Sequence, residues 1–234
     1  MNDAVGAIVL AAGFSTRFGS NKLLAKLDNG NTVIAQTTQR IDAALANSVL
    51  VTRPELAPML SVCNIELRVF DHAERGMGAT LAYAMDFTKA WSGCLICLAD
   101  MPFIAVSTYR ALAEQITDDS IVIPRFQSRE GNPVGFGRRW FPQLAALDGA
   151  SGGRSMIEAN PHSVIYFPID DQAVRNDIDT TEDLGRFQSP ASLTCRASIN
   201  LFRSQCPYCK IDEFSHTIFS TRRLFNAVTQ QQIP

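Results

Sequence analysis

Small and basic residues follow an apolar run near the start of the sequence. Gly13 and Gly19 flank a stretch that carries Arg17, and Lys22 stands three residues beyond Gly19. Small residues let backbone N–H groups approach phosphate oxygens, and basic side chains neutralise phosphate charge. The spacing fits neither a P-loop nor the Gly-x-Gly-x-x-Gly dinucleotide fingerprint. The segment predicts an anion-binding loop of another type, with a tight turn carrying two solvated basic residues as the alternative.

Two aspartates are candidate metal ligands. Asp100 ends an apolar run, and Asp179 lies in the acidic cluster 177–183. Mg²⁺ is usually held by one or two carboxylates together with substrate phosphates. In open α/β sheets, the carboxyl ends of the strands are where ligands bind, so one aspartate from each of two strand ends makes a minimal Mg²⁺ platform. Asp179 or Thr180 can also cap the helix that follows.

Alternating elements must position these residues. Short apolar runs alternate with longer segments in which apolar residues recur every three or four positions, a pattern typical of strands joined by crossover helices. The sequence therefore predicts an α/β protein with a mostly parallel sheet. The predicted strands are 4–10, 48–52, 66–70, 93–98, 120–124, 133–136 and 163–168. The predicted helices are 32–46, capped by Asn31 or Thr32, and 77–91, 106–116, 139–147, 153–159 and 180–187.

Composition narrows the class of protein. Of 234 residues, 46% are hydrophobic and 19% charged, which is typical of a compact enzyme-sized domain. A net charge of −2 disfavours binding to nucleic acid or to an anionic membrane. No apolar run approaches the roughly 20 residues that span a bilayer, and no basic stretch precedes an apolar one at the start, so we expect a cytoplasmic protein.

A change of composition near residue 188 predicts two parts. Residues 1–187 are expected to form the enzymatic domain, and residues 188–234 an accessory tail of unknown role. The tail carries five basic and two acidic residues, a charge of +3, which leaves −5 for the rest of the chain.

The first loop resembles a known family. Its matching residues are Leu10, Ala11, Ala12, Gly13, Ser15, Arg17, Gly19 and Lys22. They are similar to the loop that wraps an NTP triphosphate in nucleotidyltransferases, in particular in the molybdenum cofactor cytidylyltransferase branch. The resemblance implies a three-layer Rossmann-like nucleotidyltransferase fold, with Arg17 and Lys22 on the phosphates. Ala12 stands where the guanylyltransferase branch typically has glycine, which points to CTP over GTP.

Further segments carry the same resemblance. It implies that Asp100 and Asp179 hold Mg²⁺, and that Gly76, Gly78 and Thr80 lie near the nucleotide base. The acceptor side is implied to include Asn132 and Arg154.

The match is incomplete at three positions. Asn132 replaces a histidine of the family, Ala150 replaces an aspartate, and Thr181 replaces a proline. For Arg154, a surface arginine at the start of a helix is as good an interpretation as a ligand of the acceptor phosphate.

The implied reaction is transfer of CMP from CTP to the phosphate of a molybdopterin-type cofactor, with release of pyrophosphate. Arg17, Lys22 and Asp100 are the implied catalytic residues, acting by positioning and charge neutralisation. The implied partners are CTP or another NTP, the cofactor, and an apo-molybdoenzyme. Alternatives are a guanylyltransferase, a sugar- or alcohol-phosphate nucleotidyltransferase, an oxidoreductase, and a non-catalytic binder or chaperone of the cofactor.

The cysteines fall into two groups. Cys94 and Cys97 lie on a predicted strand at positions that face opposite sides, so we expect buried thiols that bind no common metal. Cys206 and Cys209, in the tail, share the Cys-Pro-Tyr-Cys sequence of glutaredoxin redox centres. The tail is too short for that fold, so free thiols are the favoured interpretation.

Overall fold

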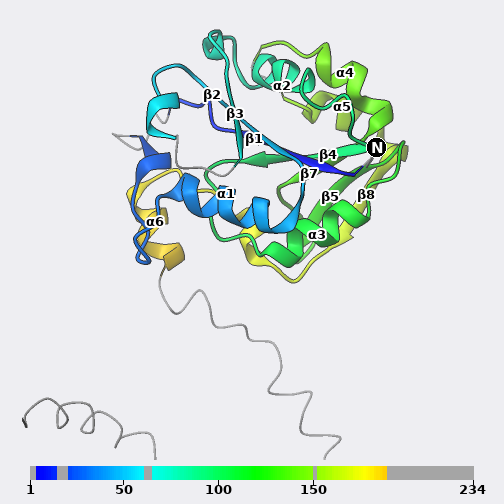
Figure 1. Ribbon diagram of the computed structural model, residues 1–234. Coiled ribbons are helices and arrows are strands. Elements are labelled where there is room, and N and C mark those ends of the chain that lie inside the picture. The colour runs from blue at the N-terminus through cyan, green and yellow to red at the C-terminus, as the bar shows by residue number, and fades with distance from the viewer. Residues whose placement is uncertain (1–3, 15–20, 61–64, 150–151, 189–234) are drawn as a thin grey trace, which may run out of the picture. The chain divides into compact units, whose positions relative to one another are not determined.

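The computed structural model describes residues 4–14, 21–60, 65–149 and 152–188 (Figure 1). Arg17, Ser15, Gly19 and the tail cysteines therefore lie outside the described residues. All described residues belong to the first of the two compact units of the chain, Met1–Ser192. Among the described helices, none combines the length and apolarity needed to cross a membrane.

The described residues form one mixed, mostly parallel sheet. Its strand order is β3-β2-β1-β4-β7-β5-β6, and β8 pairs with β5. Strand β7 is antiparallel to both of its neighbours, β4 and β5, whereas β1 is parallel to β2 and β4. The strands are β1 Gly6–Leu10, β2 Ser48–Thr52, β3 Glu66–Val69, β4 Gly93–Leu98, β5 Ile121–Phe126, β6 Arg129–Glu130, β7 Val134–Gly137 and β8 Val164–Pro168.

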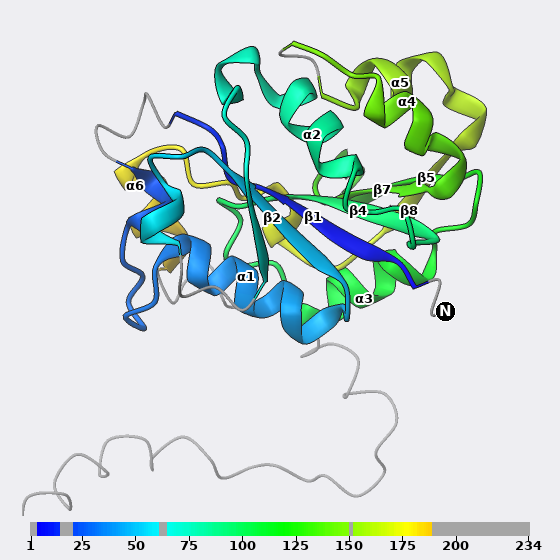
Figure 2. The same ribbon diagram turned by 45° about the horizontal axis from the view of Figure 1, so that its top comes forward.

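Helices cover both faces of this sheet and complete a three-layer α/β fold (Figure 1, Figure 2). One face packs against α1, α3 and α6, and the other against α2, α4 and α5. The helices are α1 Val33–Ala44, α2 Met77–Met85, α3 Val106–Glu114, α4 Phe141–Ala145, α5 Arg154–Ala159 and α6 Thr181–Gln188. The predicted fold class is confirmed.

Strand alternation divides the core into two clusters. In β1, Val9 packs into the cluster on the α1 face and Ile8 into the cluster on the α2 face. In β4, Cys97 and Cys94 are divided in the same way. Burial raises the pKa of the Cys94 thiol to about 12 and that of Cys97 further. The prediction that these two cysteines are buried on opposite faces is confirmed.

Element ends account for most differences from the sequence-based prediction. Thr32 caps α1, its side chain accepting from the Ala35 N–H. Helix α2 ends at Met85 rather than at residue 91, and the predicted helix 139–147 is a short 3-10 helix followed by the one-turn α4. Strand β6 was not predicted, because its two residues are polar and give no alternation. It pairs with the end of β5 to form a short hairpin.

Candidate active site

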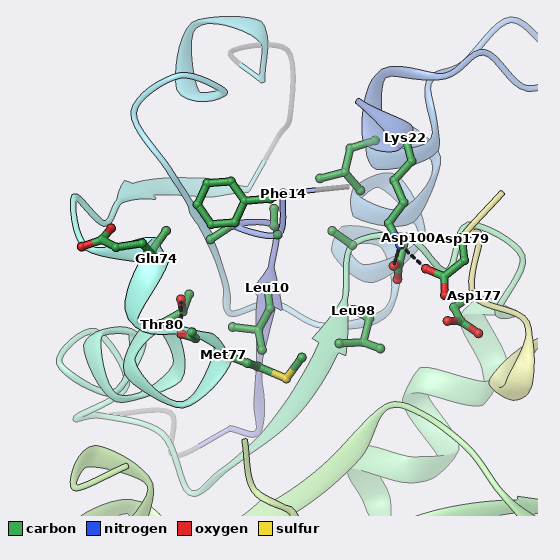
Figure 3. A pocket seen from close by; sticks show the side chains of 17 residues that line it. Leu10, Phe14, Lys22, Glu74, Met77, Thr80, Leu98, Asp100, Asp177 and Asp179 are labelled. Atoms are coloured by element: carbon green, nitrogen blue, oxygen red, sulfur yellow. Dashed lines mark hydrogen bonds and ion pairs between the residues drawn. The ribbon is translucent and has the colours of Figure 1, made fainter. Parts of the chain in front are cut away.

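A cavity of about 540 Å³ opens where β1 and β4 end (Figure 3). Leu10 and Leu98 are the last residues of those strands, and both line the cavity. This volume lies within the usual range for small-molecule sites. The lining residues are Leu10, Ala11, Ala12, Gly13, Phe14, Lys22, Leu23, Ala73, Glu74, Gly76, Met77, Thr80, Leu98, Ala99, Asp100, Asp177 and Asp179.

The first loop is anchored to the neighbouring strand. The Ala11 N–H donates to the Val51 carbonyl at 2.8 Å, and the Thr52 hydroxyl donates to the Ala11 carbonyl at 3.3 Å. The Arg53 guanidinium donates to the Gly13 carbonyl at 3.1 Å. These contacts from the end of β2 set the course of the loop, and all four predicted residues from Leu10 to Gly13 line the cavity.

Lys22 joins the two predicted metal ligands. It opens the short 3-10 helix η1 (Lys22–Leu24), which Asn21 caps by accepting from the Leu23 N–H. The Lys22 Nζ lies 2.6 Å from Asp100 Oδ2 and 2.7 Å from Asp179 Oδ1 (Figure 3). Residues far apart in the sequence thus meet at one charged end of the cavity.

Helix α1 and its side chains hold the loop that carries Asp100. The Thr37 hydroxyl donates to the Ala99 carbonyl at 3.0 Å. The Arg40 guanidinium donates to the carbonyls of Phe103 and Ile104 at 2.8 and 2.9 Å. Asp100 itself does not cap α3. It stands two residues after the end of β4, and its position is therefore fixed by the sheet on one side and by α1 on the other.

Asp179 follows β8 through a second loop. The Ile178 N–H donates to the Asp100 carbonyl at 3.0 Å, which brings the two aspartate loops together. Thr180 and Asp183 form reciprocal side-chain to backbone bonds at the start of α6, as in a capping box. Capping of α6 therefore falls to Thr180, and the Asp179 carboxylate accepts from Lys22.

Burial shapes the charges at this end of the cavity. It raises the pKa of the Asp100 carboxyl above the ordinary value, although Lys22 acts in the opposite direction. Burial lowers the pKa of Lys22, but the carboxylates of Asp100 and Asp179 outweigh it, and the net effect is a raised pKa. The second oxygen of Asp100, Oδ1, is buried and has no hydrogen-bond partner. An unsatisfied buried carboxylate oxygen is costly, and a bound cation would satisfy it.

The described carboxylates do not make a complete metal cage. No group of three or more His, Cys, Asp or Glu side chains in this part of the chain is arranged to hold a metal ion. Asp177 lines the same cavity as Asp100 and Asp179, and it is a residue that the sequence prediction missed within the acidic cluster it had singled out. A divalent cation here would thus complete its coordination with phosphate oxygens and water.

The start of α2 forms the other end of the cavity. Gly76 has φ of +105°, a conformation that favours glycine, and both the Thr80 N–H and its hydroxyl bond to the Gly76 carbonyl. Gly76 and Thr80 line the cavity, as does Met77. Gly78 does not. A Cβ atom there would lie 2.8 Å from the Asp148 carbonyl oxygen, so the absence of a side chain serves packing against that loop.

The two predicted acceptor residues lie outside the cavity lining. The Asn132 N–H donates to the Val174 carbonyl at 2.7 Å. Arg154 is 87% exposed and pairs with Glu158 one helical turn away at 2.9 Å. The structure therefore brings Lys22, Asp100 and Asp179 together with the first loop and α2, but not Asn132 or Arg154.

Two cavity features escaped the sequence prediction. Phe14 lines the cavity and is 54% exposed, and Arg53 supports it from the end of β2. Phe14 belongs to the first loop, and a large aromatic residue among small ones could have indicated a ligand contact there. Arg53 lies about 40 residues later and is brought to the loop only by the pairing of β1 with β2.

Comparison with known proteins identifies the family of this chain. A family model described as the MobA-like NTP transferase domain matches residues 7–164. The purine catabolism protein PucB of Bacillus subtilis (strain 168) is 25% identical over 189 residues, which is 75% of this chain and 92% of PucB.

Solved structures show the same architecture. The crystal structure of Rv0371c from Mycobacterium tuberculosis H37Rv is 27% identical with a TM-score of 0.71, covering 80% of this chain and 99% of that one. Its manganese complex is 24% identical with a TM-score of 0.67, covering 79% and 98%. Molybdopterin-guanine dinucleotide biosynthesis protein A from Archaeoglobus fulgidus is 20% identical with a TM-score of 0.58, covering 81% and 100%, and supports the fold. Because the family model spans more than half of the chain, this protein belongs to the MobA-like NTP transferase family of nucleotidyltransferases.

Proposed function

We propose that this nucleotidyltransferase transfers CMP from CTP to the phosphate of a molybdopterin-type cofactor and releases pyrophosphate. The observation that carries the proposal is the convergence of Lys22, Asp100 and Asp179 beside the first loop of the cavity. Ala12 lines that cavity at the position where the guanylyltransferase branch typically has glycine, which supports CTP as the donor.

The chemistry needs no protein nucleophile. An oxygen of the acceptor phosphate forms a bond to the α-phosphorus of the NTP, and the bond from that phosphorus to the bridging oxygen breaks. The electron pair leaves with pyrophosphate. The chain contributes positioning and charge neutralisation, which are the main sources of catalysis in phosphoryl transfer. Lys22 supplies a fixed cation, and we expect backbone N–H groups of the first loop to donate to the phosphates.

The residues present fit a divalent cation such as Mg²⁺. Asp100 Oδ1 is buried without a partner, and the Lys22 ammonium already lies between the two carboxylates as a cation would. Asp100 and Asp179 would hold the ion. When bound, it would neutralise phosphate charge. That a structure of similar fold was solved in complex with manganese is consistent with use of a divalent cation.

The test is pyrophosphate release with each of the four NTPs, with molybdopterin present or absent and with Mg²⁺ or Mn²⁺. We expect release only with molybdopterin, fastest with CTP. Faster release with GTP would make the protein a guanylyltransferase. Release with a sugar phosphate but not with molybdopterin would change the acceptor. Binding of molybdopterin without any release would indicate a non-catalytic binder.

Variants tie the activity to the cavity. Asp100→Ala should abolish release, because it removes a carboxylate from the charged end of the cavity. Asp86→Ala is the matched control, since Asp86 is 70% exposed at the end of α2 and makes only a surface pair with Lys89. Full activity of Asp100→Ala would overturn the assignment.

A further inference from the structure

Phe14 is exposed inside a binding cavity. Its side chain is 54% exposed, whereas most large apolar side chains of the described residues are buried. It is one of the residues that line the cavity, next to the glycine of the first loop. An exposed aromatic ring within a cavity is a ready surface for a flat ligand group.

Arg53 holds this ring in place. Its guanidinium carbon lies 4.5 Å from the centroid of the Phe14 ring, a cation–π contact. The same guanidinium donates to the Gly13 carbonyl at 3.1 Å and lies 3.4 Å from the Glu55 carboxylate. Arg53 does not line the cavity, so it supports the ring from outside. The ring is therefore positioned before any ligand arrives.

The cavity has two chemically different ends. Lys22, Asp100 and Asp179 gather at one end, and Phe14 lies at the other, on the side of Thr80 (Figure 3). Leu10 and Leu98 lie between these ends. A ligand with charged phosphates at one end and a flat, weakly polar ring at the other matches this division.

We propose that Phe14, supported by Arg53, is the surface on which the nucleobase of the NTP stacks. This inference rests on the proposed nucleotide site. Every base has a π-face, and stacking on an aromatic ring is tolerant of base identity. Phe14 therefore contributes affinity for nucleotides in general, and the choice among bases is made by other residues.

The experiment compares nucleotides with inorganic tripolyphosphate, which has the phosphates without the base. Equilibrium binding of CTP, GTP and tripolyphosphate is measured with Mg²⁺ for the wild type, Phe14→Ala and Phe14→Trp. In Phe14→Ala, we expect affinity for both nucleotides to fall about tenfold, with tripolyphosphate affinity unchanged. Phe14→Trp should retain nucleotide affinity, and its fluorescence should respond to nucleotides but not to tripolyphosphate.

Tyr166→Ala is the matched control. Tyr166 is also exposed and lies under an arginine, with Arg125 3.4 Å from its ring centroid, but it does not line the cavity. We expect wild-type binding of all three ligands. A Phe14→Ala protein that binds nucleotides as tightly as the wild type would overturn the inference. So would equal losses for nucleotides and tripolyphosphate, which would indicate a general loss of loop structure.

The binding experiment and the pyrophosphate-release assay test the two proposals independently. Failure of the wild type to release pyrophosphate would contradict the proposed function, while the binding comparison would still test the stacking. A wild type that binds tripolyphosphate as tightly as CTP would overturn the stacking without bearing on the reaction.

Discussion

At the scale of single residues, Asp100 is under opposing demands. It must carry charge to neutralise Lys22 or hold a cation, yet it is largely buried and one of its oxygens has no partner. Burial raises its pKa despite Lys22, which means that the net effect of its surroundings disfavours the charged form. Ionisation of Asp100 therefore lowers the stability of the folded protein, as is common for residues retained for function.

Replacing Asp100 with Asn should therefore abolish pyrophosphate release without destabilising the metal-free protein at neutral pH. The folded-state pKa of Asp100 is above the unfolded value, so ionisation lowers the free energy of unfolding as the pH rises through the folded-state pKa. The Asn variant lacks this loss. Its stability relative to the wild type should increase as the pH rises from the ordinary carboxyl pKa of 3.8 through the raised folded-state pKa of Asp100.

Urea unfolding of both proteins in the presence of a chelator measures this difference. A variant that is less stable than the wild type at neutral pH, and more nearly equal to it in acid, would show that the Lys22 pair outweighs burial.

At the scale of elements, one aspartate ties together the segments that carry the site. The Asp171 carboxylate accepts from the Ala105 N–H at 2.9 Å and from the Thr108 hydroxyl at 2.6 Å, at the start of α3. It also accepts from the Ala173 N–H at 3.0 Å, at the start of the short helix η6 (Gln172–Arg175). The segment before α3 carries Asp100, and the segment after η6 carries Asp179. Asp171 is therefore a positioning residue for the charged end of the cavity.

Asp171→Ala should lower the free energy of unfolding by about 2 kcal/mol, because three donors lose a charged acceptor. It should also lower kcat roughly tenfold or more through misplacement of the aspartates. Asp171→Asn, which keeps one carbonyl acceptor, should recover part of both losses. Urea unfolding and steady-state pyrophosphate release measure them.

The control for this prediction is the neighbouring Asp170→Ala, since Asp170 is exposed. A loss of stability in Asp171→Ala with kcat unchanged would mean that Asp171 supports the fold alone and does not position the site.

At the scale of the whole molecule, the cavity formed by the described residues lies within the first compact unit, Met1–Ser192. All cavity-lining residues lie between Leu10 and Asp179, and the family model ends at residue 164. The net charge of −2 is the sum of −5 for residues 1–187 and +3 for residues 188–234. We propose that residues 188–234 are an accessory segment that catalysis does not require.

A protein truncated after Ser192, at the end of the first compact unit, is expected to retain kcat within about twofold of the full chain, because the transition-state contacts remain. Pyrophosphate release and urea unfolding of both proteins test this. A large fall in kcat with unchanged stability would assign a catalytic role to the removed segment, and a rise in KM alone would assign it a role in binding.

The sequence by itself predicted the α/β class, the positions of seven strands, and the opposite burial of Cys94 and Cys97. These follow from local periodicity, since alternation along a strand decides which face a side chain joins. Family resemblance implied that Lys22 contacts the phosphates and that Asp100 and Asp179 hold Mg²⁺, and the shared edge of parallel strand ends made it plausible that the two aspartates lie close together. The direct pairing of Lys22 with both carboxylates was not predicted.

Only the tertiary structure decided which partners those residues have. Arg53 reaches Gly13 and Phe14 because β1 and β2 are paired, and Asp171 reaches α3 from the loop after β8. Gly78 packs against the Asp148 loop and does not line the cavity, because the fold brings that distant loop against the start of α2. Contacts between distant segments depend on the register and packing of the whole sheet, and no local pattern in the sequence encodes them.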